Sequence, residues 1–340
     1  SRQLDGSLSV NLAMQFPFWL ACLASFAHGQ RERSGIDRKN AEETHQLKAL
    51  RRLILAFNTA VAFSPSVLTK RPHVGSSTVL RNRRSIPRLQ AQPDIQDQED
   101  WYSIQCAAEP PSETDELMNY GMYTDPLHPG AVGHPQAHMA NMYCQLLEGT
   151  NITGLRVLEV GSGRGGGARI LHKYHRPAVY VGLDLCTPQV EASNQRLATL
   201  GSSSLVFVQG DACDLPFPDN SFDVVVNVES SHNYQPFKQF LTEVKRVLAP
   251  NGKFLIEDFR ANLRELDYMQ QEIEEVFGTD VDITDISANI QMSLEINKEY
   301  IEDRIRKCQQ FASRSDCEGY WLYCGKWPTK FFKAQLHAKS

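Results

Sequence analysis

From Leu155 onward, short apolar runs of strand length alternate with longer stretches of helical period. Five runs are predicted as buried strands: Leu155–Val160, Val179–Asp184, Leu205–Gln209, Phe222–Val228 and Lys253–Asp258. Strands that alternate with helices pair in parallel, because each helix returns the chain to the same edge of the sheet. The pattern therefore predicts the α/β class, with a doubly wound, Rossmann-like sheet.

The turn after the first predicted strand is rich in glycine. Glycines stand at positions 161, 163, 165, 166 and 167, between the strand and the next helical stretch. Glycine adopts positive φ without a Cβ clash and lets the backbone approach a ligand closely. The turn is thus a candidate cofactor site, although its spacing taken alone suits a dinucleotide equally well.

Acidic residues follow the next two strands. Asp184 ends the second strand, about 20 residues after the glycines, where a carboxylate can hold ribose hydroxyls. Gly210-Asp211-Ala212 follows the third strand, where a carboxylate can accept a hydrogen bond from an adenine amino group. The fourth strand begins Phe-Asp-Val-Val and does not open a second mononucleotide-binding half. These features favour an adenosyl cofactor over a nicotinamide dinucleotide.

Over about residues 115–326 these motifs resemble the class I S-adenosylmethionine-dependent methyltransferases. The resemblance implies a seven-stranded sheet and S-adenosyl-L-methionine as the cofactor. The cofactor-binding residues that it implies are Glu159, Gly161, Gly163, Asp184, Leu185, Asp211, Ala212, Asn227 and Tyr120. In that assignment the two glycines pack under the methionine part with Glu159 nearby, and Asn227 lines the same pocket. Asp184 would bind the ribose, while Asp211 and the Ala212 amide would bind adenine.

Further motifs are similar to the branch that contains phthiotriol-type and fatty-acid O-methyltransferases. They include Met118–Tyr123 (MNYGMY), Leu158–Ala168 (LEVGSGRGGGA) and Asn227–Tyr234 (NVESSHNY). This resemblance implies that Tyr120 and Tyr123 belong to an N-terminal segment that folds over the cofactor.

A histidine and an aspartate are candidates for the catalytic pair. His232 follows the fourth strand and Asp258 ends the fifth, so both belong at the carboxyl edge of the sheet, where ligands bind. A hydroxyl acceptor needs a base, and histidine serves near neutral pH. Asp258 would orient the imidazole, as in the natural-product O-methyltransferases that this context resembles. Alternatively, His232 closes the pocket and Asp258 caps a turn.

The resulting hypothesis is O-methylation of a hydroxyl or carboxylate on a lipophilic or specialised metabolite. A plastid S- or C-methyltransferase, acting on a small thioether acid or a prenylquinone precursor, is the alternative. A non-catalytic cofactor-binding module is a third possibility, which the intact glycine turn, Asp184 and Asp211 disfavour.

The chain divides into a basic N-terminal part and an acidic remainder. The net charge of -5 is the sum of two unlike parts. Residues 1–92 contain 14 Lys and Arg and 5 Asp and Glu, whereas residues 93–340 contain 21 Lys and Arg and 35 Asp and Glu. In the first part, basic residues precede the apolar run Leu53–Ala62, and Phe63–Gln92 holds six Lys or Arg and no acid. This composition is typical of a targeting leader, here of the complex-plastid type, or of a disordered basic tail in a cytoplasmic protein.

We expect a linker over 93–113 and a methyltransferase domain over 114–340. Within it, 262–312 is predicted as a helical lid insert over the active site, and Gly319–Lys326 as a late strand. The acidic domain disfavours nucleic acid as a partner, and no apolar run is long enough for stable membrane insertion. The cysteine and histidine spacings suit no metal site.

Overall fold

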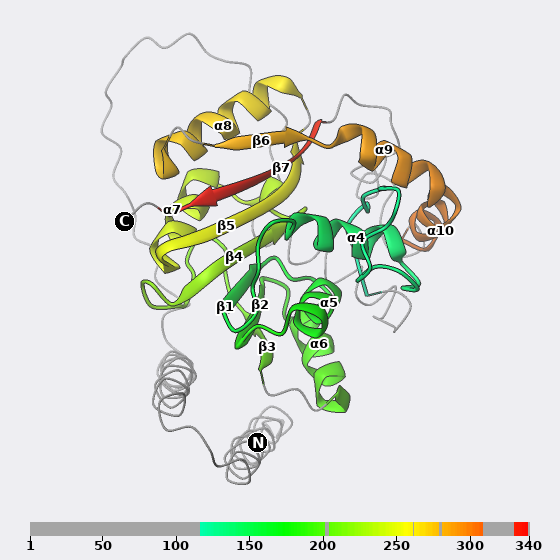
Figure 1. Ribbon diagram of the computed structural model, residues 1–340, viewed down its shortest axis with the longest axis horizontal. Coiled ribbons are helices and arrows are strands. Elements are labelled where there is room, and N and C mark those ends of the chain that lie inside the picture. Colours follow the sequence, from blue (N-terminus) through cyan, green and yellow to red (C-terminus); the bar gives the residue numbers. More distant parts are fainter. Residues whose placement is uncertain (1–115, 201–203, 261, 279–280, 309–329, 339–340) are drawn as a thin grey trace, which may run out of the picture. The chain divides into compact units, whose positions relative to one another are not determined.

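A computed structural model of the protein describes residues 116–338 except 201–203, 261, 279–280 and 309–329 (Figure 1). The chain divides into two compact units, 1–86 and 87–340, and every described residue belongs to the second. The predicted leader, the linker and the late strand at 319–326 lie outside the described residues.

The described elements form a seven-stranded sheet with the order β3-β2-β1-β4-β5-β7-β6. Its strands are β1 Arg156–Val160, β2 Val179–Asp184, β3 Leu205–Gln209, β4 Phe222–Val228, β5 Leu248–Arg260, β6 Asp282–Asp285 and β7 Lys330–His337. The first five pair in parallel, and β7 lies antiparallel to both β5 and β6. The order reverses at β1 and β4, so their carboxyl ends form the ligand-binding edge of the predicted α/β sheet.

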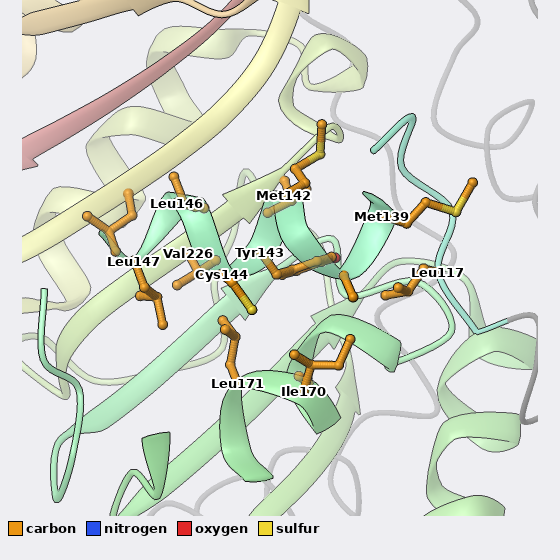
Figure 2. Close-up of a cluster of buried hydrophobic side chains, with 14 of the residues drawn as sticks. Leu117, Met139, Met142, Tyr143, Cys144, Leu146, Leu147, Ile170, Leu171 and Val226 are labelled. Atoms are coloured by element: carbon orange, nitrogen blue, oxygen red, sulfur yellow. The ribbon is translucent and has the colours of Figure 1, made fainter. Parts of the chain in front are cut away.

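Helices cover both faces of the sheet. They are α4 Ala137–Leu146, α5 Gly166–His175, α6 Thr187–Leu200, α7 Phe237–Val247, α8 Leu263–Phe277, α9 Ser287–Ile296 and α10 Lys298–Cys308. On one face, Met142 of α4, Leu171 of α5 and Val226 of β4 belong to one buried cluster (Figure 2). On the other face, Phe254 of β5 contacts Phe240 of α7 and Phe277 of α8, with ring centroids 5.8 and 6.0 Å apart. No helix in the described part of the chain is long and apolar enough to cross a membrane.

The helical insert predicted over 262–312 is wrong in one respect, because β6 interrupts it and belongs to the sheet. The helix before β6, α8, packs against α7 and β5 and buries Met269, Ile273 and Phe277. Its apolar face is therefore part of the core, and among the described residues α9 and α10 are the helices that lie between β6 and β7 in the chain. Four residues of alternating polarity are too few to stand out from the helical period around them.

Candidate active site

The glycine turn joins β1 to α5 and brings the backbone close to the loop after β4. Gly161 and Gly163 have φ of 75° and 50°. A Cβ on Gly161 would lie 2.3 Å from Ser230 Oγ and 2.5 Å from the Tyr234 hydroxyl oxygen. The Gly161 amide donates to the Leu183 carbonyl over 2.8 Å, which fixes the turn against β2. Only glycine satisfies both the dihedral angle and the close approach at position 161.

Asp184 lies beside this turn. Its Oδ2 accepts the Gly163 amide at 2.7 Å and its Oδ1 accepts the Cys186 amide at 2.9 Å. Burial raises the pKa of Asp184 above its usual value, against the lowering effect of these two amides. Two residues that the sequence assigned to one cofactor thus lie in direct contact.

The predicted adenine-binding pair follows β3, next to the end of β2. Asp211 Oδ1 accepts the Cys213 amide at 2.8 Å, which closes a short turn, and Ala212 is buried. Leu185 follows β2, and its carbonyl accepts from Gln209 Nε2 at 3.3 Å. These residues line the same edge of the sheet as Asp184.

Glu159 lies beneath the turn, fully buried in the core. Its oxygens accept hydrogen bonds from the hydroxyls of Tyr143, at 3.1 Å, and Tyr180, at 2.8 Å. Burial raises its pKa to about 8, although the two tyrosine hydroxyls favour the ionised form. These hydrogen bonds join β1 to α4 and β2. In this structure Glu159 therefore stabilises the position of the strand from which the glycine turn starts.

Two buried acceptor atoms lie where β4 ends. The Asn227 amide donates to the Val160 carbonyl at 3.0 Å and to Ser230 Oγ at 2.8 Å, while its Oδ1 has no hydrogen-bond partner among the described residues. Glu229 Oε1 is likewise buried without one. Glu229 has a φ of 44°, which is uncommon for a residue with a side chain and recurs at functional sites. Sequence reasoning missed Glu229; its place directly after β4 was the available signal.

The N-terminal segment 117–124 extends over this edge. The Tyr120 amide donates to Glu229 Oε2 at 2.9 Å, and the Tyr120 carbonyl accepts from Ser293 Oγ of α9 at 2.9 Å. Met118 Sδ lies 3.3 Å from the position that a Cβ on Gly163 would occupy. Hydrogen bonds to Glu229, directly after β4, and to Ser293 of α9 thus hold the segment in place.

His232 and Asp258 meet at the carboxyl edge. His232 Nδ1 lies 2.8 Å from Asp258 Oδ1, and the His232 amide donates to Oδ2 at 3.0 Å. Ser231 Oγ donates to Oδ2 at 2.5 Å, and the Arg260 guanidinium lies 3.7 Å away. Burial opposes ionisation of Asp258, but His232, Arg260 and Ser231 outweigh it and lower its pKa to about 2.

The other surroundings of His232 determine which of its nitrogens can take a proton. An ionised Asp258 accepts only, so the Nδ1 beside it carries the hydrogen. Nε2 then presents its lone pair, and Asn233 Nδ2 lies 2.9 Å from it. The Phe259 ring covers the imidazole with centroids 4.2 Å apart. In this tautomer Nε2 is the acceptor nitrogen, and it can take a proton from a ligand once the Asn233 amide no longer donates to it.

The residues present fit S-adenosylmethionine. Asn227 Oδ1 and Glu229 Oε1, at the end of β4 beside the glycine turn, are buried acceptors without a hydrogen-bond partner among the described residues, and they suit an ammonium group. No cluster of three metal-ligating side chains occurs in the ranges that the structure describes.

Comparison with known proteins also indicates a protein that uses S-adenosylmethionine. Residues 158–256 match the family model of a methyltransferase domain. The fatty-acid O-methyltransferase of Mycolicibacterium smegmatis is 49% identical over 42% of this chain and 53% of its own length. A probable phthiotriol/phenolphthiotriol dimycocerosates methyltransferase of Mycobacterium ulcerans is 38% identical over 57% of this chain and 75% of its own length. The chain thus spans about half of the first relative and three quarters of the second.

Two solved structures share the fold at low sequence identity. The [4+2]-cyclase SpnF has a TM-score of 0.56 at 17% identity, with 73% of this chain and 98% of that chain covered. The geranyl diphosphate C-methyltransferase of Streptomyces coelicolor has a TM-score of 0.53 at 14% identity over the same shares. Fold, site and relatives together define a class I, S-adenosylmethionine-dependent methyltransferase. The chain belongs to the methyltransferase family of its fatty-acid and phthiotriol relatives.

Proposed function

We propose that the protein transfers a methyl group to an oxygen atom of a lipophilic acceptor, with His232 as the base when that oxygen is a hydroxyl. The observation that carries this proposal is the 2.8 Å contact between His232 Nδ1 and Asp258 Oδ1 at the carboxyl edge. S-adenosylmethionine supplies the methyl group, as a sulfonium methyl that a nucleophilic oxygen can take.

The chain contributes alignment and proton transfer. Gly161, Gly163, Asp184, Asp211 and Asn227 would hold the cofactor at the edge of the sheet. In the proposed step the acceptor oxygen forms a bond to the methyl carbon, the carbon–sulfur bond breaks, and the hydroxyl proton moves to Nε2 of His232. We call His232 and Asp258 the dyad. Alignment supplies much of the rate in such displacements, and a positioned base adds a factor of about 10² to 10⁴.

A lipophilic acceptor is supported by the aromatic side chains beside the dyad. Phe259 covers His232, and Tyr120 and Phe331 meet Phe259 with centroids 6.1 and 5.4 Å away. We call Tyr120, Phe259 and Phe331 the aromatic cluster. The names of the relatives, a fatty-acid O-methyltransferase and phthiotriol dimycocerosates methyltransferases, support an oxygen acceptor on a lipid.

The test is His232→Ala, measured with labelled S-adenosylmethionine and two acceptors, 1-dodecanol and dodecanoate. With the alcohol, kcat is expected to fall by about 10² or more, because no group takes the proton. With the carboxylate, which is already ionised, the loss is expected to be much smaller. Cofactor affinity, measured by calorimetry, should stay within about twofold, since the assigned cofactor residues are unchanged.

His337→Ala is a suitable control, because His337 is exposed at the far end of β7. Full turnover of the alcohol by His232→Ala would show that His232 is not the base. An equal fall in cofactor affinity and turnover would instead assign the histidine to the shape of the pocket.

A further inference from the structure

Arg260 is a largely buried cation at the end of β5, two residues after Asp258 of the dyad. Its side chain is 10% exposed, and its guanidinium carbon lies over two rings, 4.9 Å from the centroid of Phe237 and 5.8 Å from that of Phe332. Asp258 pairs with Phe332, and alternate residues of a strand share a face, so Arg260 projects to the same face of the sheet as Asp258. Phe259 of the aromatic cluster projects to the other face. Burying a cation costs free energy unless charge or hydrogen bonds compensate it, so the groups around Arg260 indicate its role.

Two hydrogen bonds fix the guanidinium beside the dyad. Arg260 Nη1 donates to the Phe259 carbonyl at 2.7 Å, and Nη2 donates to Ser231 Oγ, in the loop after β4, at 3.3 Å. Nη1 also lies 3.7 Å from Asp258 Oδ2. One guanidinium thus contacts the strand that carries the dyad aspartate and the loop that carries the dyad histidine.

The chemistry of the groups sets the direction of each hydrogen bond around Asp258. A guanidinium only donates, so Ser231 Oγ accepts from Arg260, and its single hydrogen is left for Asp258 Oδ2, at 2.5 Å. An ionised carboxylate only accepts, so Asp258 Oδ1 receives the hydrogen of His232 Nδ1, at 2.8 Å. Donation from a cation also strengthens the hydrogen bond that the serine hydroxyl makes in turn. Donors from both sides therefore converge on the Asp258 carboxylate.

We propose that Arg260 is a positioning residue of the dyad, which acts through Ser231 to hold Asp258 in the orientation that receives the hydrogen of His232 Nδ1. The consequence for methyl transfer rests on the proposed function. Without the guanidinium, the Ser231 hydroxyl is free to turn and the carboxylate loses a fixed donor. The imidazole then also populates the tautomer with hydrogen on Nε2, which neutral histidine favours in water. That tautomer cannot take a proton at Nε2.

NMR of the full chain labelled with ¹⁵N-histidine tests the positioning role without turnover. At about pH 9, above the ordinary pKa of histidine, the nitrogen shifts identify the tautomer of each imidazole. The His232 signals are those that disappear in His232→Ala. We expect the Nδ1–H tautomer in the native chain and a mixture with Nε2–H in Arg260→Gln. Ser231→Ala keeps the guanidinium but removes the hydroxyl through which it acts, and should shift the tautomer in the same direction.

Turnover of 1-dodecanol gives a second readout. Arg260→Gln is expected to lower kcat at least about tenfold, because part of the contribution of the positioned base is lost. KM for the alcohol and the affinity for S-adenosylmethionine should stay within about twofold, since the assigned cofactor residues are unchanged. Arg260→Lys should recover part of kcat, because lysine keeps the charge but lacks the planar fork that reaches Phe259 and Ser231 together.

Arg264→Gln is the matched control, because it removes the same charge from an exposed position on α8. It should keep the tautomer and the turnover of the native chain, and melting temperatures of all variants check folding. A native tautomer in Ser231→Ala or in folded Arg260→Gln, or an equal change in Arg264→Gln, overturns the positioning role. If the tautomer shifts as expected but the native chain does not methylate 1-dodecanol, the positioning role stands and the proposed function fails.

Discussion

Glu257 is a carboxylic acid in the interior of the sheet, on β5 next to Asp258. It is 1% exposed, and neither of its oxygens has a hydrogen-bond partner in the part of the chain described. Burial raises its pKa from 4.5 to about 8, although the positive charge of Lys333 partly opposes the shift. Glu257 is therefore protonated in the folded protein at pH values where the unfolded chain has lost that proton.

This difference gives the free energy of unfolding a pH dependence of defined sign. A raised pKa favours folding fully below about pH 4.5, and the contribution is lost as the pH rises toward about 8. The glutamine of Glu257→Gln cannot ionise. We therefore expect the free energy of unfolding of this variant to exceed that of the native chain by about 1–3 kcal/mol at pH 8, and to be close to that of the native chain at pH 5. Urea unfolding at both pH values measures the difference.

Glu295→Gln is the control for this experiment, because Glu295 is exposed on α9. It should follow the native chain at both pH values. If Glu257→Gln gains no stability between pH 5 and pH 8 relative to the native chain, the assigned shift is wrong.

At the scale of single residues, a role that follows from the position of a residue in a sequence motif can be predicted. A role that depends on contacts with distant segments of the chain cannot. The sequence predicts Asp184 as a site residue from its position at the end of β2, and the structure places it against Gly163. Glu229 has a position signal directly after β4, but its contact with Tyr120 depends on the N-terminal segment, which is distant in sequence. Glu257 has no such signal, because its environment depends on β7.

At the scale of elements, the glycine turn between β1 and α5 is held by a close contact with the loop after β4. Gly161→Ala would bring a Cβ within 2.3 Å of Ser230 Oγ and also impose a φ of 75° on alanine. Gly154→Ala imposes nearly the same φ, 74°, but its Cβ meets nothing within 4 Å. The pair therefore separates the clash from the backbone strain.

We expect Gly154→Ala to cost about 1 kcal/mol of stability through its dihedral angle and to leave cofactor binding unchanged. Gly161→Ala should cost about 1–3 kcal/mol more and weaken S-adenosylmethionine binding at least about tenfold. Thermal unfolding and calorimetry measure both quantities. Equal cofactor affinity in the two variants would contradict the role assigned to the turn.

The alternation of apolar runs and helical stretches predicted β1 to β5, and the structure confirms all five. The boundary of the insert was wrong because β6 is short and is stabilised by pairing with β7 rather than by its own sequence. Pairing between segments about 50 residues apart cannot be read from local periodicity.

At the scale of the whole molecule, the described domain provides the sheet, the cofactor edge and the His232–Asp258 pair within one compact unit. The basic segment 1–92 and its assignment as a plastid leader stay predictions, since these residues lie outside the described part. The acceptor also stays a proposal, because relatives and fold define the methyl donor more closely than the methyl acceptor.

The position of the transferred methyl group tests the central claim most directly. The full chain is incubated with S-adenosylmethionine carrying a ¹³C-labelled methyl group and with 1-dodecanol, dodecanoate or a lipid extract, and the product is identified by NMR and mass spectrometry. The account predicts the label on oxygen, as a methyl ether or a methyl ester. Label on sulfur, carbon or nitrogen, or no labelled product from any of these acceptors, would contradict it.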